Sequence, residues 1–441
     1  MGGIVGINQN YENVIYECKN YGDIVGENID GYVAGIISYA NNSMAKLINN
    51  ENYGNVTVKS FNESTNASSY YRDASIAGIC AYKYYDMLLY NCKNKGNITI
   101  EDATNKTKGG IYIAGIAGGS NGSTEKISKK IYNYGKITVK NSASNVYASG
   151  CLSGDRIRVG EAINRGNIEV NSKKDIIVSG INNGYSWYNS GLYKGEKINY
   201  GDISAISESG NIRVYGISFF DDNTKLKNYG NLYAKGRDVI VRGISSVSYT
   251  RDYNECFNKG NITVEASTAK VSGLTEYGNS FNNCYNEGNI EIISNGDVEC
   301  AGIAPRGSGV INSNCYNSGD INIYSNGTTS VTGLIFDCSG IKDSYNKGNI
   351  SVVNNGNTYI SGIGRTMSDI SNCYNVGNMN LVTTKSSYNV VSGISFDSNR
   401  PVNCYNEGDI TVINGGESTW VGPITALTTR GNQSLRSCKF I

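Results

Sequence analysis

The stretch Asn283-Cys284-Tyr285-Asn286-Glu287-Gly288-Asn289-Ile290 decides the fold, because shortened copies of it recur along nearly the whole chain. The core of the stretch is Asn-x-Gly, followed by Asn, Asp or Lys and then by an aliphatic residue or Met. The thirteen copies place their glycine at Gly22, Gly54, Gly96, Gly135, Gly166, Gly201, Gly230, Gly260, Gly288, Gly319, Gly348, Gly377 and Gly408. From Gly201 onward the steps are 28 to 31 residues. A fixed period of this size is typical of a repeat architecture.

The residues after each motif glycine alternate between apolar and polar. Ile290 and Ile292 flank Glu291, and the other copies repeat this pattern. Period-two alternation predicts a half-buried strand, whereas a helix needs apolar residues three and four positions apart. The repeats are therefore expected to be β.

A second motif follows the first after 13 to 16 residues in most repeats. It is a small or polar residue followed by Gly-Ile or Gly-Leu, as in Thr332-Gly333-Leu334, and an apolar residue stands two positions before its glycine. A bend or bulge at this glycine would return the following aliphatic side chain to the core. Each repeat is thus predicted to hold two short strands joined by two corners.

Asn-x-Gly itself is predicted to form the first corner, because Asn and Gly tolerate left-handed backbone and Asn hydrogen-bonds neighbouring backbone groups. In stacked coils these amides can bond to one another in a ladder. The alternative is a row of ligand-binding amides. In the regular repeats the corner residues are Asn258, Gly260, Asn286, Gly288, Asn317, Gly319, Asn346 and Gly348.

Stacking is required because one repeat cannot bury its apolar face alone. The expected fold is an all-β, right-handed parallel β-solenoid of about 13 repeats of about 30 residues. A propeller or closed barrel is the alternative, and it would need more strands per repeat. We expect one domain over residues 1–441, with irregular, loop-inserted coils over 1–215 and regular coils over 216–441. Both ends fall inside a repeat without a polar cap, which predicts a fragment of a longer protein.

Composition excludes several functions. The 39 Lys and Arg residues balance 38 Asp and Glu, so electrostatics give no case for binding nucleic acid or an anionic membrane. No run approaches 18 apolar residues, so no membrane insertion is expected. The chain has no His, which excludes Ser-His-Asp, Cys-His and HExxH sites. No cofactor and no metal are expected.

Seven of the twelve cysteines stand four residues before a motif glycine. Other repeats place Ile131, Ala162 or Leu226 there, so buried free thiols are expected. One alternative is disulfides between neighbouring repeats, although directly stacked strand residues are poorly placed for them. The other is a metal site, which lacks Cys-x-x-Cys and His. The seven are Cys18, Cys92, Cys256, Cys284, Cys315, Cys373 and Cys404.

Carboxylates are the remaining catalytic candidates, and they are Asp221, Asp222, Asp337 and Asp397. Asp337 and Asp397 each stand four residues after a second-motif glycine, two repeats apart. Strand spacing would separate them by ~9.6 Å, near the upper limit for an inverting glycosidase pair. The alternative is that they are solvated acids at corners.

Aromatic residues gather in the segments that lead from a second motif to the next first motif. Exposed aromatic loops on a rigid scaffold suit glycan or protein binding, and the alternative is tyrosines that only pack the loops. The main candidates are Tyr185, Trp187, Tyr188 and Tyr193, and the others are Tyr82, Tyr84, Tyr85, Tyr249 and Tyr253.

The alternation of Cys-Tyr-Asn-x-Gly-(Asn/Asp)-Ile with (Ser/Ala)-Gly-(Ile/Leu) resembles the glycine-rich GLUG repeats of bacterial cell-surface and secreted proteins. Such repeats also accompany peptidase domains in some immunoglobulin A-cleaving proteases. Gly2 to Gly6, reading Gly-Gly-Ile-Val-Gly, is the nearest copy of the family motif, while the other repeats here prefer Gly-Ile. The resemblance implies an exported stalk or adhesive array, and it implies no activity for the repeats.

Three functions follow as hypotheses. The first is a non-catalytic extracellular scaffold, stalk or adhesin-like module of a bacterial surface or secreted protein, although the chain itself shows no signal peptide. Its partners would be a host glycan, a host protein or other domains of the same polypeptide. The second is a glycan-active β-helix enzyme, a polysaccharide lyase or hydrolase. The third is an accessory repeat region of a secreted peptidase.

Overall fold

The computed structural model describes residues 1–8, 14–29, 31–40, 45–62, 74–83, 87–101, 110–119, 127–154, 158–184, 195–218, 225–246, 252–307, 312–383, 388–413, 418–427 and 439–440. Every regular element in these ranges is a β-strand. The chain groups into two compact units, described separately below. The N-terminal unit comprises Met1–Asp222, Lys227–Asn231 and Lys235–Arg237, and the C-terminal unit comprises Asn223–Leu226, Leu232–Ala234 and Asp238–Ile441.

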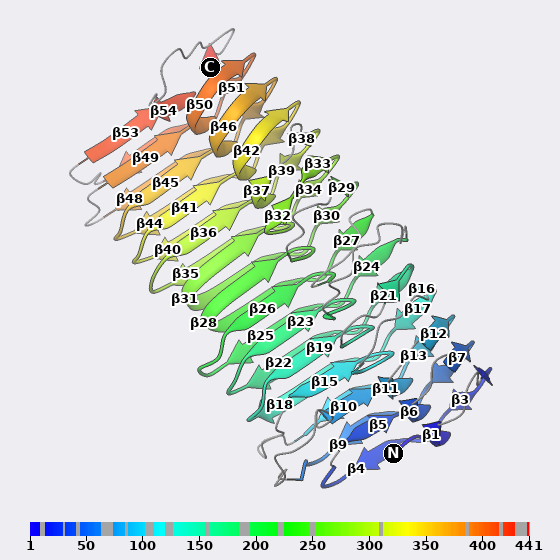
Figure 1. Ribbon diagram of the computed structural model, residues 1–441. Helices are drawn as coiled ribbons and strands as arrows, with labels where there is room; N and C mark the ends of the chain where they lie inside the picture. The colour runs from blue at the N-terminus through cyan, green and yellow to red at the C-terminus, as the bar shows by residue number, and fades with distance from the viewer. Residues whose placement is uncertain are drawn as a thin grey trace. The chain divides into compact units, whose positions relative to one another are not determined.

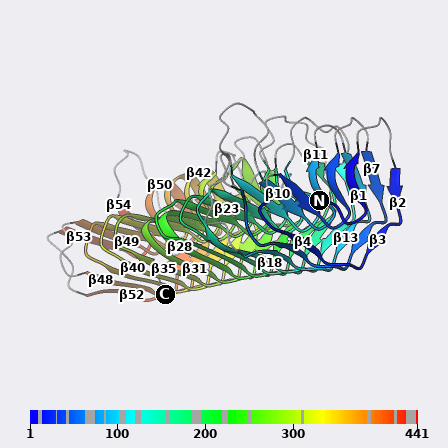
Figure 2. The same ribbon diagram turned by 90° about the horizontal axis from the view of Figure 1, so that it is seen from below.

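Each unit is a parallel β-solenoid, which confirms the predicted fold and removes the propeller and barrel alternatives. Within each unit every coil pairs in parallel with the next, and Figures 1 and 2 show equivalent strands side by side in coil order. In the C-terminal unit, Ile262, Ile290, Ile321 and Ile350 are successive register partners. All four side chains are fully buried, as the period-two pattern predicted.

A regular coil holds four strand segments, so the prediction of two strands per repeat was wrong. A corner strand carries the motif Asn, a first strand follows the motif glycine, a second strand leads to the second motif, and a return strand follows it. The coil that begins at Cys315 shows all four, as β39 (Tyr316–Asn317), β40 (Ile321–Ser325), β41 (Thr329–Thr332) and β42 (Ile335–Lys342). The segments expected to be return loops are largely strands, because each pairs with its equivalent in the neighbouring coil.

The N-terminal unit repeats the same four positions. Its corner strands are β3 (Lys19–Asn20), β8 (Glu51–Asn52), β13 (Lys93–Asn94), β17 (Ile131–Asn133), β21 (Ala162–Asn164) and β24 (Lys197–Asn199). Its first strands are β4 (Ile24–Gly26), β9 (Val56–Val58), β14 (Ile98–Ile100), β18 (Ile137–Ser142), β22 (Ile168–Ser172) and β25 (Ile203–Ser207). Its second strands are β5 (Tyr32–Ala34), β10 (Ala74–Ala77), β15 (Ile111–Ala114), β19 (Val146–Ser149), β23 (Ile176–Ser179) and β26 (Ile212–Tyr215). Its return strands are β1 (Val5–Asn8), β2 (Val14–Tyr16), β6 (Ile37–Ala40), β7 (Ala45–Ile48), β11 (Cys80–Lys83), β12 (Met87–Tyr90), β16 (Ile127–Ser128) and β20 (Arg158–Val159).

The C-terminal unit is more regular. The remaining corner strands are β30 (Phe257–Asn258), β34 (Tyr285–Asn286), β43 (Tyr345–Asn346), β47 (Tyr374–Asn375), β51 (Tyr405–Asn406) and β55 (Lys439–Phe440). First strands are β35 (Ile290–Ser294), β44 (Ile350–Asn354), β48 (Met379–Thr383) and β52 (Ile410–Ile413), and second strands are β36 (Val298–Ala301), β45 (Thr358–Ser361), β49 (Tyr388–Ser392) and β53 (Ser418–Gly422). In β31 (Ile262–Ser272) the first and second strands are continuous. Return strands are β29 (Asp252–Asn254), β32 (Tyr277–Gly278), β33 (Ser280–Asn282), β37 (Ala304–Gly307), β38 (Asn312–Ser313), β46 (Gly364–Ser371), β50 (Ser395–Val402) and β54 (Thr425–Leu427). Two further strands, β27 (Leu226–Asn228) and β28 (Leu232–Arg242), have residues in both units.

The second-motif glycine performs the predicted turn back into the core, since Leu274, Leu334 and Ile363 behind it are fully buried. This glycine recurs in every second motif for a further reason, because the backbone at this point lies very close to the motif Asn of the next coil. A Cβ on Gly333 would lie 2.0 Å from the carbonyl oxygen of Gly362 and 2.6 Å from Cγ of Asn346. The motif Asn of each coil therefore packs against the second-motif glycine of the preceding coil, and only glycine leaves room for it.

The motif asparagines form the expected ladder of buried amides. Asn317 Nδ2 donates to Gly319 O at 2.8 Å and to Asn346 Oδ1 at 2.9 Å, and the other coils repeat both bonds. The ladder runs from Asn20 to Asn228 in the N-terminal unit and from Asn258 to Asn406 in the C-terminal unit.

The left-handed backbone does not lie where the sequence predicted it. In most coils it falls five residues before the motif glycine, as at Asn283 (φ 53°) and Asn314 (φ 53°), and not at Asn-x-Gly. The motif Asn stabilises its corner through the side chain, by bonding the carbonyl of the motif glycine two residues on.

The described cysteines are free, and all except the half-buried Cys18 are buried. Five of those in the C-terminal unit directly precede a corner strand, as Cys315 precedes β39, whereas Cys300 lies on β36 and Cys338 on β42. Burial raises the pKa of the Cys315 thiol to about 12. The burial expected for this sequence position is confirmed except at Cys18.

Candidate binding groove

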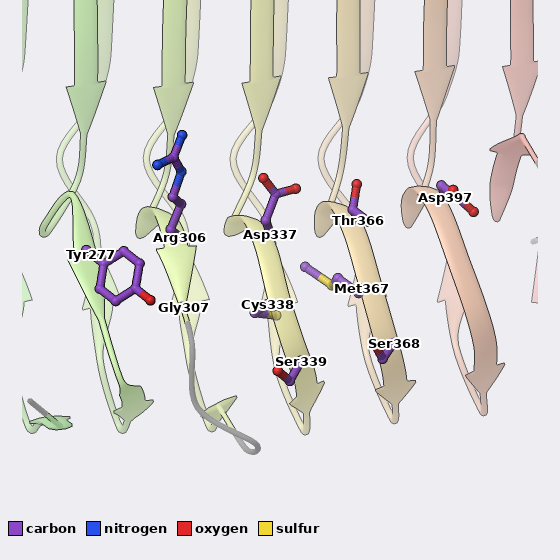
Figure 3. Close-up of a pocket in the computed structure, with 10 residues that line it drawn as sticks. All are labelled: Tyr277, Arg306, Gly307, Asp337, Cys338, Ser339, Thr366, Met367, Ser368 and Asp397. Carbon is purple, nitrogen blue, oxygen red and sulfur yellow. The ribbon is translucent and has the colours of Figure 1, made fainter. Parts of the chain in front are cut away.

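The second-motif glycines align a further residue in five successive coils of the C-terminal unit. Four positions after Gly273, Gly302, Gly333, Gly362 and Gly393 stand the residues that we call the groove row: Tyr277, Arg306, Asp337, Thr366 and Asp397. They are register partners of one another on β32, β37, β42, β46 and β50. Figure 3 shows the five in a line across neighbouring return strands.

The groove row borders a cavity of about 330 Å³, which its five members line together with Gly307, Cys338, Ser339, Met367 and Ser368. A second cavity of about 390 Å³ shares Arg306 and Asp337 with it and extends towards Lys270, Glu299, Ser330 and Arg365. Arg306 and Asp337 therefore stand between two hollows on one face of the unit.

Asp337 is held by an ion pair. Arg365 Nη2 lies 3.0 Å from Asp337 Oδ2, and Arg365 Nε lies 3.4 Å from Asp337 Oδ1. The guanidinium also lies over the Phe336 ring, 5.6 Å from its centroid. Because both charged side chains are about two-fifths exposed, at 41% and 38%, solvent screens the pair. Its effect is to fix where the carboxylate points.

Asp397 and Arg306 differ in burial. Asp397 is buried, with 8% of the residue exposed, at the far end of the groove row from Tyr277. Arg306 is exposed, and its side chain makes no hydrogen bond or ion pair with any residue in the described ranges. The Arg306 guanidinium therefore remains available to a ligand.

The structure brings together only part of what the sequence proposed. Asp337 and Asp397 do line one groove, and they lie on strands and not at solvated corners. Tyr253 is buried on β29 and bonded to Ser245, and Tyr82 is buried and stacked on Tyr32, so neither is an exposed binding aromatic. The other aromatic and acidic candidates lie outside the described residues: Tyr84, Tyr85, Tyr185, Trp187, Tyr188, Tyr193, Asp221, Asp222 and Tyr249.

Sequence reasoning missed Tyr277, Arg306 and Thr366, although a signal for them was present. Asp337 and Asp397 were recognised by their offset of four from a second-motif glycine, and the same offset gives the other three. The signal was overlooked because the five residues differ in chemical type. The parallel register of the strands places residues with the same offset side by side, and only this register brings the five residues onto one surface.

A second array on the C-terminal unit is a stack of aromatic rings along the corner strands. Tyr285, Tyr316 and Tyr345 stack at centroid distances of 4.7 and 5.1 Å, and Phe257, Tyr374 and Tyr405 continue the stack. Burial, and then the hydrogen bond to Glu287, raise the pKa of Tyr316. Because each ring face is covered by a neighbouring ring, the stack offers only edges and hydroxyls, and we assign it a packing role.

Neither a metal cluster nor a spanning helix is present in the part of the chain that the structure describes. No group of three or more His, Cys, Asp or Glu side chains is placed there to hold an ion. Among the same residues no helix is long and apolar enough to cross a membrane. Comparisons with known protein families, with curated proteins and with solved structures found no significant match to this chain.

Proposed function

We propose that this chain is a non-catalytic, extracellular repeat scaffold, a stalk or adhesin-like module of a bacterial surface or secreted protein. The observation that most supports this proposal is that the repeated motif asparagines have a structural role. The motif asparagines are buried, and each bonds its own corner and the next coil. These side chains hold coils together, and a fixed surface is what such a scaffold provides to a partner.

The proposed location rests on the resemblance of the repeats to GLUG arrays, and it has a direct test. Antibodies against the chain should label intact cells of the source organism or its culture medium, and external protease should remove the label from cells. Label found only after cell lysis would overturn the extracellular assignment. The same antibodies would identify a longer parent polypeptide. A parent that carries a peptidase domain would support the alternative that this chain is an accessory repeat region of a secreted peptidase.

A glycan-cleaving enzyme is the second candidate, and one observation favours it. Asp337 and Asp397 line the same cavity, two strand spacings apart, or about 9.6 Å. An inverting pair is separated by about 6.5–9.5 Å, so the spacing lies at the limit. Against this, Asp337 is engaged by Arg365.

Product analysis separates the two candidates. The chain is incubated for days with neutral and acidic polysaccharides, and mass spectrometry follows the release of oligosaccharides. The scaffold proposal predicts no products. Products formed by the wild type, but not by Asp337→Asn or Asp397→Asn, would overturn it in favour of the enzyme.

A further inference from the structure

The groove row repeats along the stack with the spacing of the coils. Its five members follow one another at the strand separation of about 4.8 Å, and they are register partners throughout. A ligand that touches one member per coil must therefore be extended, lie along the stack and repeat at this distance. An extended peptide advances about 3.3 Å per residue, so it cannot place one residue at each coil. A pyranose ring spans a distance closer to the strand separation, so a linear polysaccharide can place one ring at each coil.

The charged side chains of the two cavities are of both signs. Lys270, Arg306 and Arg365 supply three positive charges, and four carboxylates face them: Asp297, Glu299, Asp337 and Asp397. The lining therefore offers no excess of positive charge for a polyanion. It does offer both charged donors and charged acceptors, and these form the stronger hydrogen bonds with hydroxyl groups.

Uncharged groups complete the lining. Thr366, Ser339 and Ser368 add hydroxyls to the cavity wall, and each can donate and accept. At one end of the groove row Figure 3 shows the ring of Tyr277, an aromatic surface of the kind on which a sugar ring packs. The ring stands beside Arg306, which has no partner among the described residues.

We propose that this groove binds a linear, uncharged polysaccharide along the stack, with one sugar ring at each coil from Tyr277 to Asp397. The inference rests on the proposed function as a scaffold, and it supplies the ligand class of that scaffold. Arg306 and Thr366 donate to ring hydroxyls, the carboxylates accept from them, and Tyr277 packs against the terminal ring.

The experiment measures binding of neutral oligosaccharides by calorimetry. Gluco-, manno-, xylo- and N-acetylglucosamine oligomers of two to eight units are titrated into the full chain. Affinity should rise with each added ring up to the five coils of the groove row and then level off. Arg306→Ala and Thr366→Val should each weaken binding of the hexamer, the former by about tenfold or more because it removes a charged donor. Lys342→Ala, an exposed change on the same strand as Asp337 but outside both cavities, should leave affinity unchanged.

Circular dichroism of each variant verifies that the fold is kept. The inference is overturned if no neutral hexamer binds, if Arg306→Ala and Thr366→Val bind as the wild type does, or if a polyuronate or an extended peptide binds in place of the neutral hexamers. Failure here is distinguishable from failure of the scaffold. Absent binding with no cleavage removes the groove inference alone, whereas groove-dependent binding with cleavage removes only the non-catalytic assignment.

Discussion

Replacing Asn317 with Ala tests whether the amide ladder holds neighbouring coils together. The side chain makes three hydrogen bonds: it accepts from Asn286 Nδ2 at 2.8 Å and donates to Gly319 O at 2.8 Å and Asn346 Oδ1 at 2.9 Å. At about 1 kcal/mol each, their loss costs about 3 kcal/mol. Leaving buried acceptors unpaired adds about 1 kcal/mol or more. The expected local destabilisation is therefore about 4 kcal/mol.

Native-state hydrogen exchange is the suitable assay, because repeat arrays open locally and do not always unfold in one step. The amides of Ser318 and Lys347, which bond across the coils at 2.9 and 2.8 Å, report on the site. Their exchange should accelerate by roughly a hundred- to a thousandfold, at tenfold per 1.4 kcal/mol. Asn322→Ala, an exposed change in the same coil, is the control and should leave exchange unaltered.

A charged substitution sharpens this test. Asn317→Asp keeps the shape of the side chain but places a carboxylate opposite two acceptors, Gly319 O and Asn346 Oδ1. The carboxylate can donate a hydrogen bond to either acceptor only when it is protonated. Its pKa in the fold should therefore be raised, so that stability is kept at low pH and is lost as pH rises through that value. Unchanged exchange in Asn317→Ala, or no effect of pH on Asn317→Asp, would refute the idea that the ladder stabilises the stack.

Three further predictions concern pH, the thiols and the glycines. Hydrogen bonds from Tyr53 and Lys95 lower the pKa of Glu51 from 4.5 to about 2, so the stabilisation that Glu51 provides is present above pH 4.5 and is lost as pH falls towards 2. The difference in melting temperature between wild type and Glu51→Gln should therefore shrink over that pH range, and a constant difference would contradict this prediction. The buried thiols should resist alkylation until the chain unfolds while half-buried Cys18 reacts first, because burial keeps the reagent away and, at Cys315, also raises the pKa. Rapid native labelling counted by mass spectrometry would show otherwise. Gly333→Ala should lower the urea midpoint, since its Cβ would lie 2.0 Å from Gly362 O, whereas Ser339→Ala at an exposed position should not, and equal midpoints for the two would count against the close packing of the motifs.

The regular features of the fold could be predicted from the sequence because they depend on local periodicity. Alternation after each motif glycine identified the buried Ile column, and the recurrence of Asn at one position identified the ladder. The count of strands could not be read in the same way. The return segments are short and mixed in composition, and they become strands because the neighbouring coil supplies their hydrogen-bond partners.

By itself, the sequence determined the repeat, the β class, the buried column and the burial of most cysteines that stand four residues before a motif glycine, since each depends on side-chain type at a fixed interval. The tertiary structure decided why the second-motif glycine is invariant, because the close approach of Gly333 to Asn346 joins residues of different coils. It also decided the groove. Tyr277, Arg306, Asp337, Thr366 and Asp397 share no chemistry that a pattern could reveal, and parallel register alone places them side by side.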